Sequence, residues 1–255
     1  MHNRISILLI TVVLFNSVIA PATAFAETRL TIVSSRPKVT IGAVVMPAAV
    51  DTSVVWIGDS LARIDKPDGS IFIFEQKSQT AIKLLPKFEM YQKTIFAAQA
   101  PDSISAEESL MAGLAKLVTD TSTHVEATAD TGTVNGYHCR KYIVNETKAG
   151  LITVYKRSEV WATTDIGVNF ELYKIITNIA ELISAESLDG VKDLLQVNGV
   201  TVLRTGTITP APDPDSIAPV INIAGGDRTE LVKVEKLPAP AGLYEVPAGY
   251  ELSRD

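Results

Sequence analysis

Ser60 is a residue whose sequence context could support nucleophilic catalysis, because the string Gly58-Asp59-Ser60-Leu61 follows the apolar run Val54 to Ile57. A serine hydroxyl becomes a nucleophile when a histidine takes its proton and a third group orients that histidine. Residues 27–255 contain His124 and His138, and neither has an aspartate three positions before it. Turn chemistry explains the glycine and the aspartate without catalysis. We therefore expect a hairpin turn at this string.

The same four letters mark the nucleophilic serine of GDSL-type hydrolases, but three features of this chain depart from that pattern. Those enzymes carry their histidine late in the chain in an Asp-x-x-His pattern, and no histidine follows His138. Gly225-Gly226-Asp227 lacks the asparagine of their oxyanion block. A helix should follow the serine, but the next residues run into Pro67, which interrupts one. A GDSL-type hydrolase is thus the third interpretation, and we expect a protein that is not an enzyme.

His138 and Cys139 could suggest a metal site or a cysteine–histidine pair. Neighbours on a strand point to opposite faces, so the two side chains cannot meet at one ion. Cys139 is the sole cysteine, which excludes an intramolecular disulfide and favours a packed free thiol. Asp213, Asp215 and Asp227 are separated by prolines and depart from the calcium-loop pattern. We expect no metal ligands and no cofactor.

The first 26 residues have the three regions of a cleavable secretory signal peptide. Arg4 precedes an apolar stretch from Ile5 to Ala20, and Ala24-Phe25-Ala26 has the small-x-small spacing that signal peptidase requires. The apolar stretch is shorter than the roughly 20 residues of a spanning helix. Cleavage between Ala26 and Glu27 leaves residues 27–255 as a single exported domain, which we expect to be periplasmic.

Charge narrows the set of partners. The whole chain has a net charge of −6, and loss of Arg4 with the leader gives −7 for the mature chain. An acidic chain without a Lys/Arg cluster cannot neutralise phosphates, so nucleic acid is not an expected partner. No segment after the leader is apolar for long enough to span a membrane, so we expect no transmembrane span in the mature chain.

The pattern of elements favours the α+β class. Short β-rich runs separated by turn residues fill residues 29–96, and strand patterns resume after His124. A capping-box pair, Ser105 and Glu108, predicts a helix that extends to Val118. A second helical pattern begins near Asn169, restarts at Ser187 and ends at Asn198-Gly199. Without a strand–helix–strand rhythm, we expect an antiparallel sheet with two helical segments on one face.

The segment Pro210 to Asp227 is rich in proline and aspartate and reads as an insertion. Its prolines remove the amide donors that a strand ladder needs. We expect a loop, dispensable for folding, between strands Val200–Ile208 and Leu231–Lys236 that pair with each other. The alternative is that the apolar residues Val220, Ile221 and Ile223 form a strand packed on the core.

Four strings that occur in order along the chain resemble the DUF4412 family of bacterial exported proteins. They are Gly58-Asp59-Ser60-Leu61-Ala62-Arg63-Ile64-Asp65, Gly136-Tyr137-His138-Cys139-Arg140-Lys141-Tyr142, Glu159-Val160-Trp161-Ala162-Thr163-Thr164-Asp165-Ile166-Gly167 and Tyr244-Glu245-Val246-Pro247-Ala248-Gly249-Tyr250. The resemblance implies a fold like that of the lipoprotein carriers LolA and LolB, in which a curved, half-barrel-like antiparallel sheet wraps over helices around an apolar cavity. It supplies no reaction, and the segment 210–227 departs from it.

The leading hypothesis is a non-enzymatic periplasmic protein that binds an apolar ligand, such as an acyl chain or a lipidated protein, between sheet and helices. The aromatic candidates for ligand contact are Trp56, Phe72, Phe74 and Trp161. The alternative is an envelope interaction or structural protein that has no small ligand and contacts another exported protein.

The small-x-small spacing predicts that the exported protein begins at Glu27. Intact-mass measurement on material secreted by cells should give the mass of residues 27–255. A mass that includes residues 1–26 would contradict the prediction.

Overall fold

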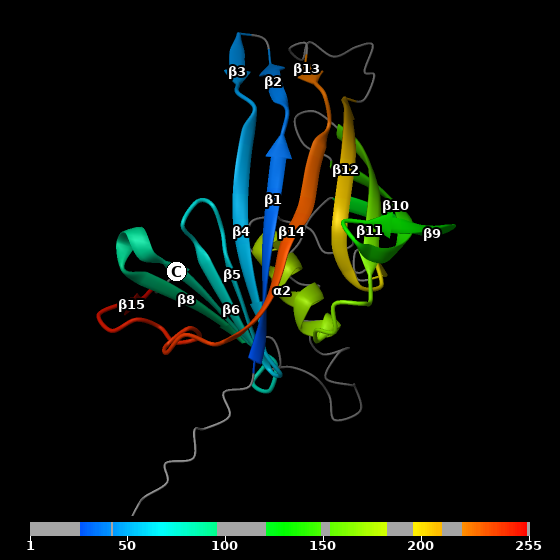
Figure 1. Cartoon of the computed structure of the whole chain (residues 1–255). Coiled ribbons are helices and arrows are strands. Elements are labelled where there is room, and N and C mark those ends of the chain that lie inside the picture. The colour runs from blue at the N-terminus through cyan, green and yellow to red at the C-terminus, as the bar shows by residue number, and fades with distance from the viewer. Residues whose placement is uncertain are drawn as a thin grey trace, which may run out of the picture.

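The computed structural model describes residues 26–41, 43–95, 121–148, 154–182, 196–210 and 221–253. Within them a twelve-stranded sheet runs in the order β15-β8-β7-β6-β5-β4-β1-β14-β12-β11-β10-β9 (Figure 1). Its strands are β1 (Ala26–Arg36), β4 (Ala49–Ile57), β5 (Leu61–Asp65), β6 (Ile71–Glu75), β7 (Thr80–Leu85), β8 (Met90–Ile95), β9 (Thr121–Val134), β10 (Tyr137–Lys148), β11 (Val154–Thr163), β12 (Val200–Pro210), β14 (Asp227–Pro238) and β15 (Glu251–Leu252).

A second, three-stranded sheet extends beyond one end of the large sheet (Figure 1). It consists of β13 (Ile221–Ala224), β2 (Lys38–Ile41) and β3 (Val44–Met46), in that order. The described helices are the 3₁₀ turn η1 (Pro86–Phe88) and the α-helix α2 (Phe170–Leu182).

The expected α+β class with two helical segments is wrong. The described residues are mostly strand and contain one α-helix, α2, of 13 residues. The sheet has two arms: β4 to β8 form the first, and β9, β10, β11 and β12 form the second. The second arm consists of long strands, such as β9 with 14 residues, whose Thr and Val content suits a pleated sheet. The helix predicted from Ser105 to Val118 and the restart at Ser187 lie outside the described residues. None of the described helices is long and apolar enough to cross a membrane.

Helix α2 itself begins where the sequence indicates. The side-chain oxygen of Asn169 accepts a hydrogen bond from the backbone N–H of Leu172 at 3.2 Å, which caps the first turn. Leu172, Ile176 and Ile179 are at most 1% exposed and form the apolar stripe of the helix. This stripe packs on β5 and β6, and α2 lies in the bend between the two arms of the sheet (Figure 1).

The main core lies between α2 and the sheet face that contacts it, which we call the concave face. Its sheet residues alternate along their strands, as Val55 and Ile57 do on β4 and Phe72 and Phe74 do on β6. The other members of this core come from β1, β5, β7, β12 and β14 and from the segments around α2; they include Leu30, Ala62, Ile64, Ala81, Val200, Val202 and Leu231.

Two turns confirm the predictions from local sequence. The N–H of Gly58 donates to the carbonyl of Leu61 at 2.9 Å and closes the β4–β5 hairpin, with a strand rather than a helix after Ser60. Asn135 and Gly136 both have positive φ, 49° and 83°, and connect β9 to β10. That conformation matches the right-handed twist of the two strands.

The insertion is only partly the loop that its composition suggests. Strands β12 and β14 do pair, with Leu203 opposite Glu230 and Gly206 opposite Asp227, but these β14 residues precede the expected strand Leu231–Lys236, which pairs with β1 instead. However, Ile221–Ala224 forms β13, which pairs with β2. Residues 211–220 lie outside the described residues.

The segment after β14 crosses the face opposite α2. The carbonyl of Leu243 accepts a 2.6 Å hydrogen bond from Arg63 on β5, and the Tyr244 hydroxyl donates to Glu27 on β1. Burial, together with the Glu27 carboxylate, raises the pKa of Tyr244. The segment ends in β15, which pairs in parallel with β8, the one parallel pair of the large sheet as described.

Gly199 precedes β12 with φ +106°, and a Cβ there would lie 2.3 Å from the carbonyl oxygen of Thr163. Gly199→Ala should therefore lower the unfolding free energy by more than the ~1–2 kcal/mol of a left-handed residue alone. Gly69, with φ +84° and nothing within 4 Å of a Cβ, isolates that backbone cost. Urea titrations should show a larger loss for Gly199→Ala than for Gly69→Ala; equal losses would contradict the close contact.

Candidate ligand-binding site

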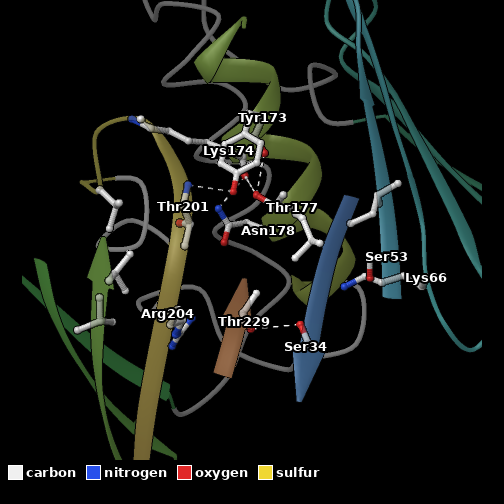
Figure 2. A pocket seen from close by; sticks show the side chains of 16 residues that line it. Ser34, Ser53, Lys66, Tyr173, Lys174, Thr177, Asn178, Thr201, Arg204 and Thr229 are labelled. Carbon is white, nitrogen blue, oxygen red and sulfur yellow. Dashed lines mark hydrogen bonds between the residues drawn. The ribbon is translucent and has the colours of Figure 1, made fainter. Parts of the chain in front are cut away.

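A cavity of about 180 Å³ lies between α2 and the concave face (Figure 2). Strands from both arms of the sheet and one side of α2 contribute to it. It is lined by Ile32, Ser34, Ser53, Ile64, Lys66, Val144, Val160, Tyr173, Lys174, Thr177, Asn178, Val197, Gly199, Thr201, Arg204 and Thr229.

Helix α2 turns a polar side toward this cavity, next to its apolar stripe. Tyr173 and Thr177 are four positions apart and share one side of the helix, and Asn178 also lines the cavity (Figure 2). Thr177 donates its hydroxyl to the Tyr173 carbonyl at 2.7 Å. The Tyr173 hydroxyl accepts a hydrogen bond from the N–H of Thr201 at 3.3 Å, which ties this side of the helix to β12.

The opposite side of the cavity is formed by β1, β4, β14 and the end of β5. Ile32 pairs with Ser53 across β1 and β4, and the Ser34 and Thr229 hydroxyls share a hydrogen bond of 3.1 Å (Figure 2). Lys66 directly follows β5, and its N–H donates to the Ser70 carbonyl at 2.9 Å. The backbone of the β5–β6 turn therefore fixes where the lysine side chain begins.

Charged side chains on the second arm form a network at the edge of the cavity. Arg204 on β12 donates to Glu146 on β10 at 2.5 Å, and their side chains are 18% and 10% exposed. Lys156 on β11 lies 2.6 Å from the carboxylate of Asp227 and 3.9 Å from that of Glu146. Buried charges of this kind are tolerated only when they are paired.

Three polar atoms in or near this network have no hydrogen-bond partner in the described structure: Nε of Arg204, Oδ1 of Asp227 and Oγ of Ser158. A buried polar atom without a partner costs free energy.

The lining of the cavity combines apolar side chains with polar and cationic ones. Five aliphatic side chains line it, together with hydroxyl groups, one amide and three cations, and these sixteen residues include no carboxylate. The three cations are Lys66, Lys174 and Arg204. The lining thus offers apolar contact and hydrogen-bond donors to the same ligand.

The four aromatic residues predicted from the sequence lie elsewhere. Phe74 and Phe72 are 0% and 4% exposed and belong to the core, and Phe72 also lines a neighbouring surface pocket. Trp56 alternates with the core residues of β4, under the guanidinium of Arg29 at 5.7 Å. Trp161 is half-buried at the edge of the core. None of the four lines the cavity, and their role as ligand contacts stays a prediction.

Ser60 lies in the β4–β5 turn and lines a different surface pocket with Glu27, Asp59, Asn169 and Lys236, among others. The residues that line that pocket, all within the described ranges, include no histidine. Its position is that of the turn residue expected from the sequence.

Cys139 is the packed free thiol that the sequence predicts. It is 3% exposed, and burial raises the pKa of its thiol. His138, its neighbour on β10, is exposed and so faces the other way. A search of the described residues found no cluster of metal-binding side chains. Asp213 and Asp215 lie outside those residues, and Asp227 pairs with Lys156.

Sequence reasoning missed Ser53, Lys66 and Arg204. Ser53 and Lys66 lie at the ends of the expected strands, where polar residues suggest a turn, and Arg204 lies within one, where a charged side chain suggests a solvent-facing position. The signal that was present is the inward register: Ser53 is two residues before Val55, and Arg204 is two residues after Val202, on strands whose core face those valines mark.

Comparisons with known proteins leave the family open. No family model matches the chain, so membership of DUF4412 is not confirmed, and no curated protein matches it. Solved structures to which it is similar include PNGF-II in the C2 space group, at 12% identity and a TM-score of 0.38, with 89% of this chain and 30% of that one covered. PNGF-II in the P21 space group is 13% identical with a TM-score of 0.39, and 89% of this chain and 31% of that one are covered. The chain thus spans about a third of PNGF-II.

A LolA superfamily protein, NE2245 from Nitrosomonas europaea, is also among the similar structures. It is 5% identical with a TM-score of 0.27, and 86% of this chain and 90% of that one are covered. Likeness at these scores does not establish a shared fold. The curved antiparallel sheet is a property of this chain, and the relation to the lipoprotein carriers stays a hypothesis.

The buried pair of Arg204 and Glu146 makes a prediction about stability. Glu146→Leu should lower the unfolding free energy by about 3 kcal/mol, because it leaves a mostly buried guanidinium without its closest partner. The double variant Glu146→Leu/Arg204→Met should recover most of that loss. Arg36→Met, which removes an exposed ion pair of 3.5 Å, should change the unfolding free energy by less than about 1 kcal/mol. Urea titrations measure all three, and a double variant as unstable as Glu146→Leu would contradict the coupling.

Proposed function

We propose that the mature chain is a non-enzymatic exported protein that binds a small amphiphile, or the end of an acyl chain, in the cavity between α2 and the concave face. The observation that carries this proposal is the mixed lining of that cavity: aliphatic side chains from both arms of the sheet alongside hydroxyl groups and cations. Ligand sites of this kind combine apolar walls with a few placed polar groups.

The aliphatic part of the lining supplies the apolar contact. Ile32 and Ile64 lie on β1 and β5, Val144 and Val160 on the second arm, and Val197 just before β12. A volume of about 180 Å³ lies below the roughly 300–1,000 Å³ of pockets for drug-sized ligands. The ligand is thus a short chain, or only the end of a longer acyl group on a lipid or a lipidated protein enters.

The composition of the lining also favours binding over catalysis. Proton transfer at neutral pH needs a histidine, a carboxylate or a perturbed lysine or cysteine at hydrogen-bond distance from the substrate. The sixteen lining residues, all within the described ranges, include no histidine, cysteine, aspartate or glutamate. Export to the periplasm rests on the leader sequence, and β1 begins at Ala26, beside the expected cleavage site.

A specific observation favours the second candidate, an envelope protein that contacts another exported protein. Val44, Val45, Met46 and Val50 on and beside the three-stranded sheet are 63%, 52%, 45% and 71% exposed. These grouped side chains give the three-stranded sheet an exposed apolar surface that could contact another protein. If this three-stranded sheet crosslinks to another exported protein in cells and no ligand occupies the cavity, the second function is favoured over the first.

Filling the cavity tests the proposal. Thr177→Trp places an indole in the space beside α2 and should weaken the binding of 1-octanol at least tenfold, while the melting temperature stays within a few degrees. Glu171→Trp, at an exposed position one and a half turns earlier on the same helix, is the matched control and should bind 1-octanol as the wild type does. Calorimetric titration measures both, and equal affinities in the two variants would contradict binding in this cavity.

A further inference from the structure

We propose that one corner of the cavity, formed by Lys66, Ser53, Ser34 and Thr229, is an anion subsite that binds the carboxylate or phosphate head of the amphiphile. The inference rests on the proposed function, because it names the chemistry of the ligand held there. All four residues line the cavity, and all four lie on or directly after strands of the large sheet.

Strand register brings the four residues together. Ser34 lies opposite Thr229 on one side of β1, and Ile32 lies opposite Ser53 on the other. Val54 pairs with Asp65 across β4 and β5, so the next residues outward, Ser53 and Lys66, are neighbours. Figure 2 shows these two side chains next to each other, with the Ser34–Thr229 hydrogen bond on the adjoining strands.

The corner has more hydrogen-bond donors than it uses. Within the described residues the Lys66 ammonium makes no ion pair or side-chain hydrogen bond, and the Ser53 hydroxyl makes none either. Ser34 and Thr229 share one hydrogen bond, which leaves one of their two hydroxyl hydrogens to donate elsewhere. One ammonium and two hydroxyl donors can satisfy the oxygens of a carboxylate or phosphate.

Lys66 also lines a neighbouring surface pocket, and the two carboxylates that line that pocket with it, Asp51 and Asp68, are already engaged. Asp51 pairs with Arg36 at 3.5 Å. Asp68 accepts hydrogen bonds from the N–H and the hydroxyl of Ser70, at 2.9 and 2.6 Å, and these bonds lower the pKa of Asp68 more than the charge of Lys66 does. Arg204 across the cavity has its own partner in Glu146. Lys174, the third lining cation, is not without a partner either. Lys66 is therefore the lining cation best placed to receive an added anion.

The position of the corner also fits the apolar lining. Ile32 and Ile64 flank it on β1 and β5. The other aliphatic residues are Val144 and Val160 on the second arm and Val197 just before β12. An amphiphile whose head binds at Lys66 would thus extend its chain across the cavity along α2. The head is fixed by charge and the chain by apolar contact.

The test compares ligands that share a chain but differ in the head. Octanoate should bind the wild type about tenfold or more tighter than 1-octanol, since a hydrogen-bonded charge pair is worth about 1.5–3 kcal/mol. Lys66→Met should remove that preference and leave 1-octanol binding unchanged. Lys66→Arg should restore most of it. Octyl phosphate in the same titrations distinguishes the two head groups, and a preference for either one over 1-octanol supports the subsite.

Lys83→Met is the matched control. Lys83 is a cation of a neighbouring pocket, 5.8 Å from the ring of Phe72, and does not line the cavity. Its replacement should leave the octanoate preference within about twofold. If neither octanoate nor 1-octanol binds the wild type, the proposed function is overturned. If both bind with equal affinity, or if Lys66→Met keeps the preference, the anion subsite alone is overturned.

Discussion

The pairing of β1 on both of its edges is the constraint on which the rest of the molecule depends. On one side β1 pairs with β4 from Thr28 to Arg36, and on the other it pairs with β14, from Ala26 opposite Pro238 to Ser35 opposite Arg228. The first contact joins β1 to the strands β4 to β8, and the second joins it to β12, β11, β10 and β9. Without β1 the two arms would be separate sheets, and neither would enclose a cavity with α2.

The position of helix α2 depends on the bend between the two arms of the sheet, and the packing of α2 stabilises that bend in turn. The apolar stripe of the helix covers core residues of β5 and β6, which would otherwise leave a large apolar surface in water. The adjoining polar side of the same helix meets β12 through Tyr173 and Thr201. The 13-residue helix therefore covers the core of the first arm. Its contact with β12 also fixes the distance between α2 and the second arm, on either side of the cavity.

What could be predicted from sequence was local. The turn at Gly58–Leu61, the turn at Asn135-Gly136, the start of α2 and the buried thiol of Cys139 each follow from a few adjacent residues and their backbone preferences. The class was wrong because the described residues are mostly strand and contain one α-helix, while the helix predicted from Ser105 to Val118 and the restart at Ser187 lie outside them. The pair of Arg204 and Glu146, 58 residues apart, could not be predicted from any short window of sequence. Charged residues on a strand pattern read as solvent-facing until the register places both on the inner side.

The charged network at Arg204 determines which lining cations already have a carboxylate partner. A buried ion pair adds little net stability, because the desolvation of both charges offsets much of their attraction. Here its consequence is local charge balance: Glu146 holds Arg204, and Asp227 holds Lys156, so the cations on the second arm are matched by carboxylates behind them. Lys66 on the first arm has no such match within the described residues. Of Lys66 and Arg204, Lys66 is therefore the cation that the proposed anionic head would approach.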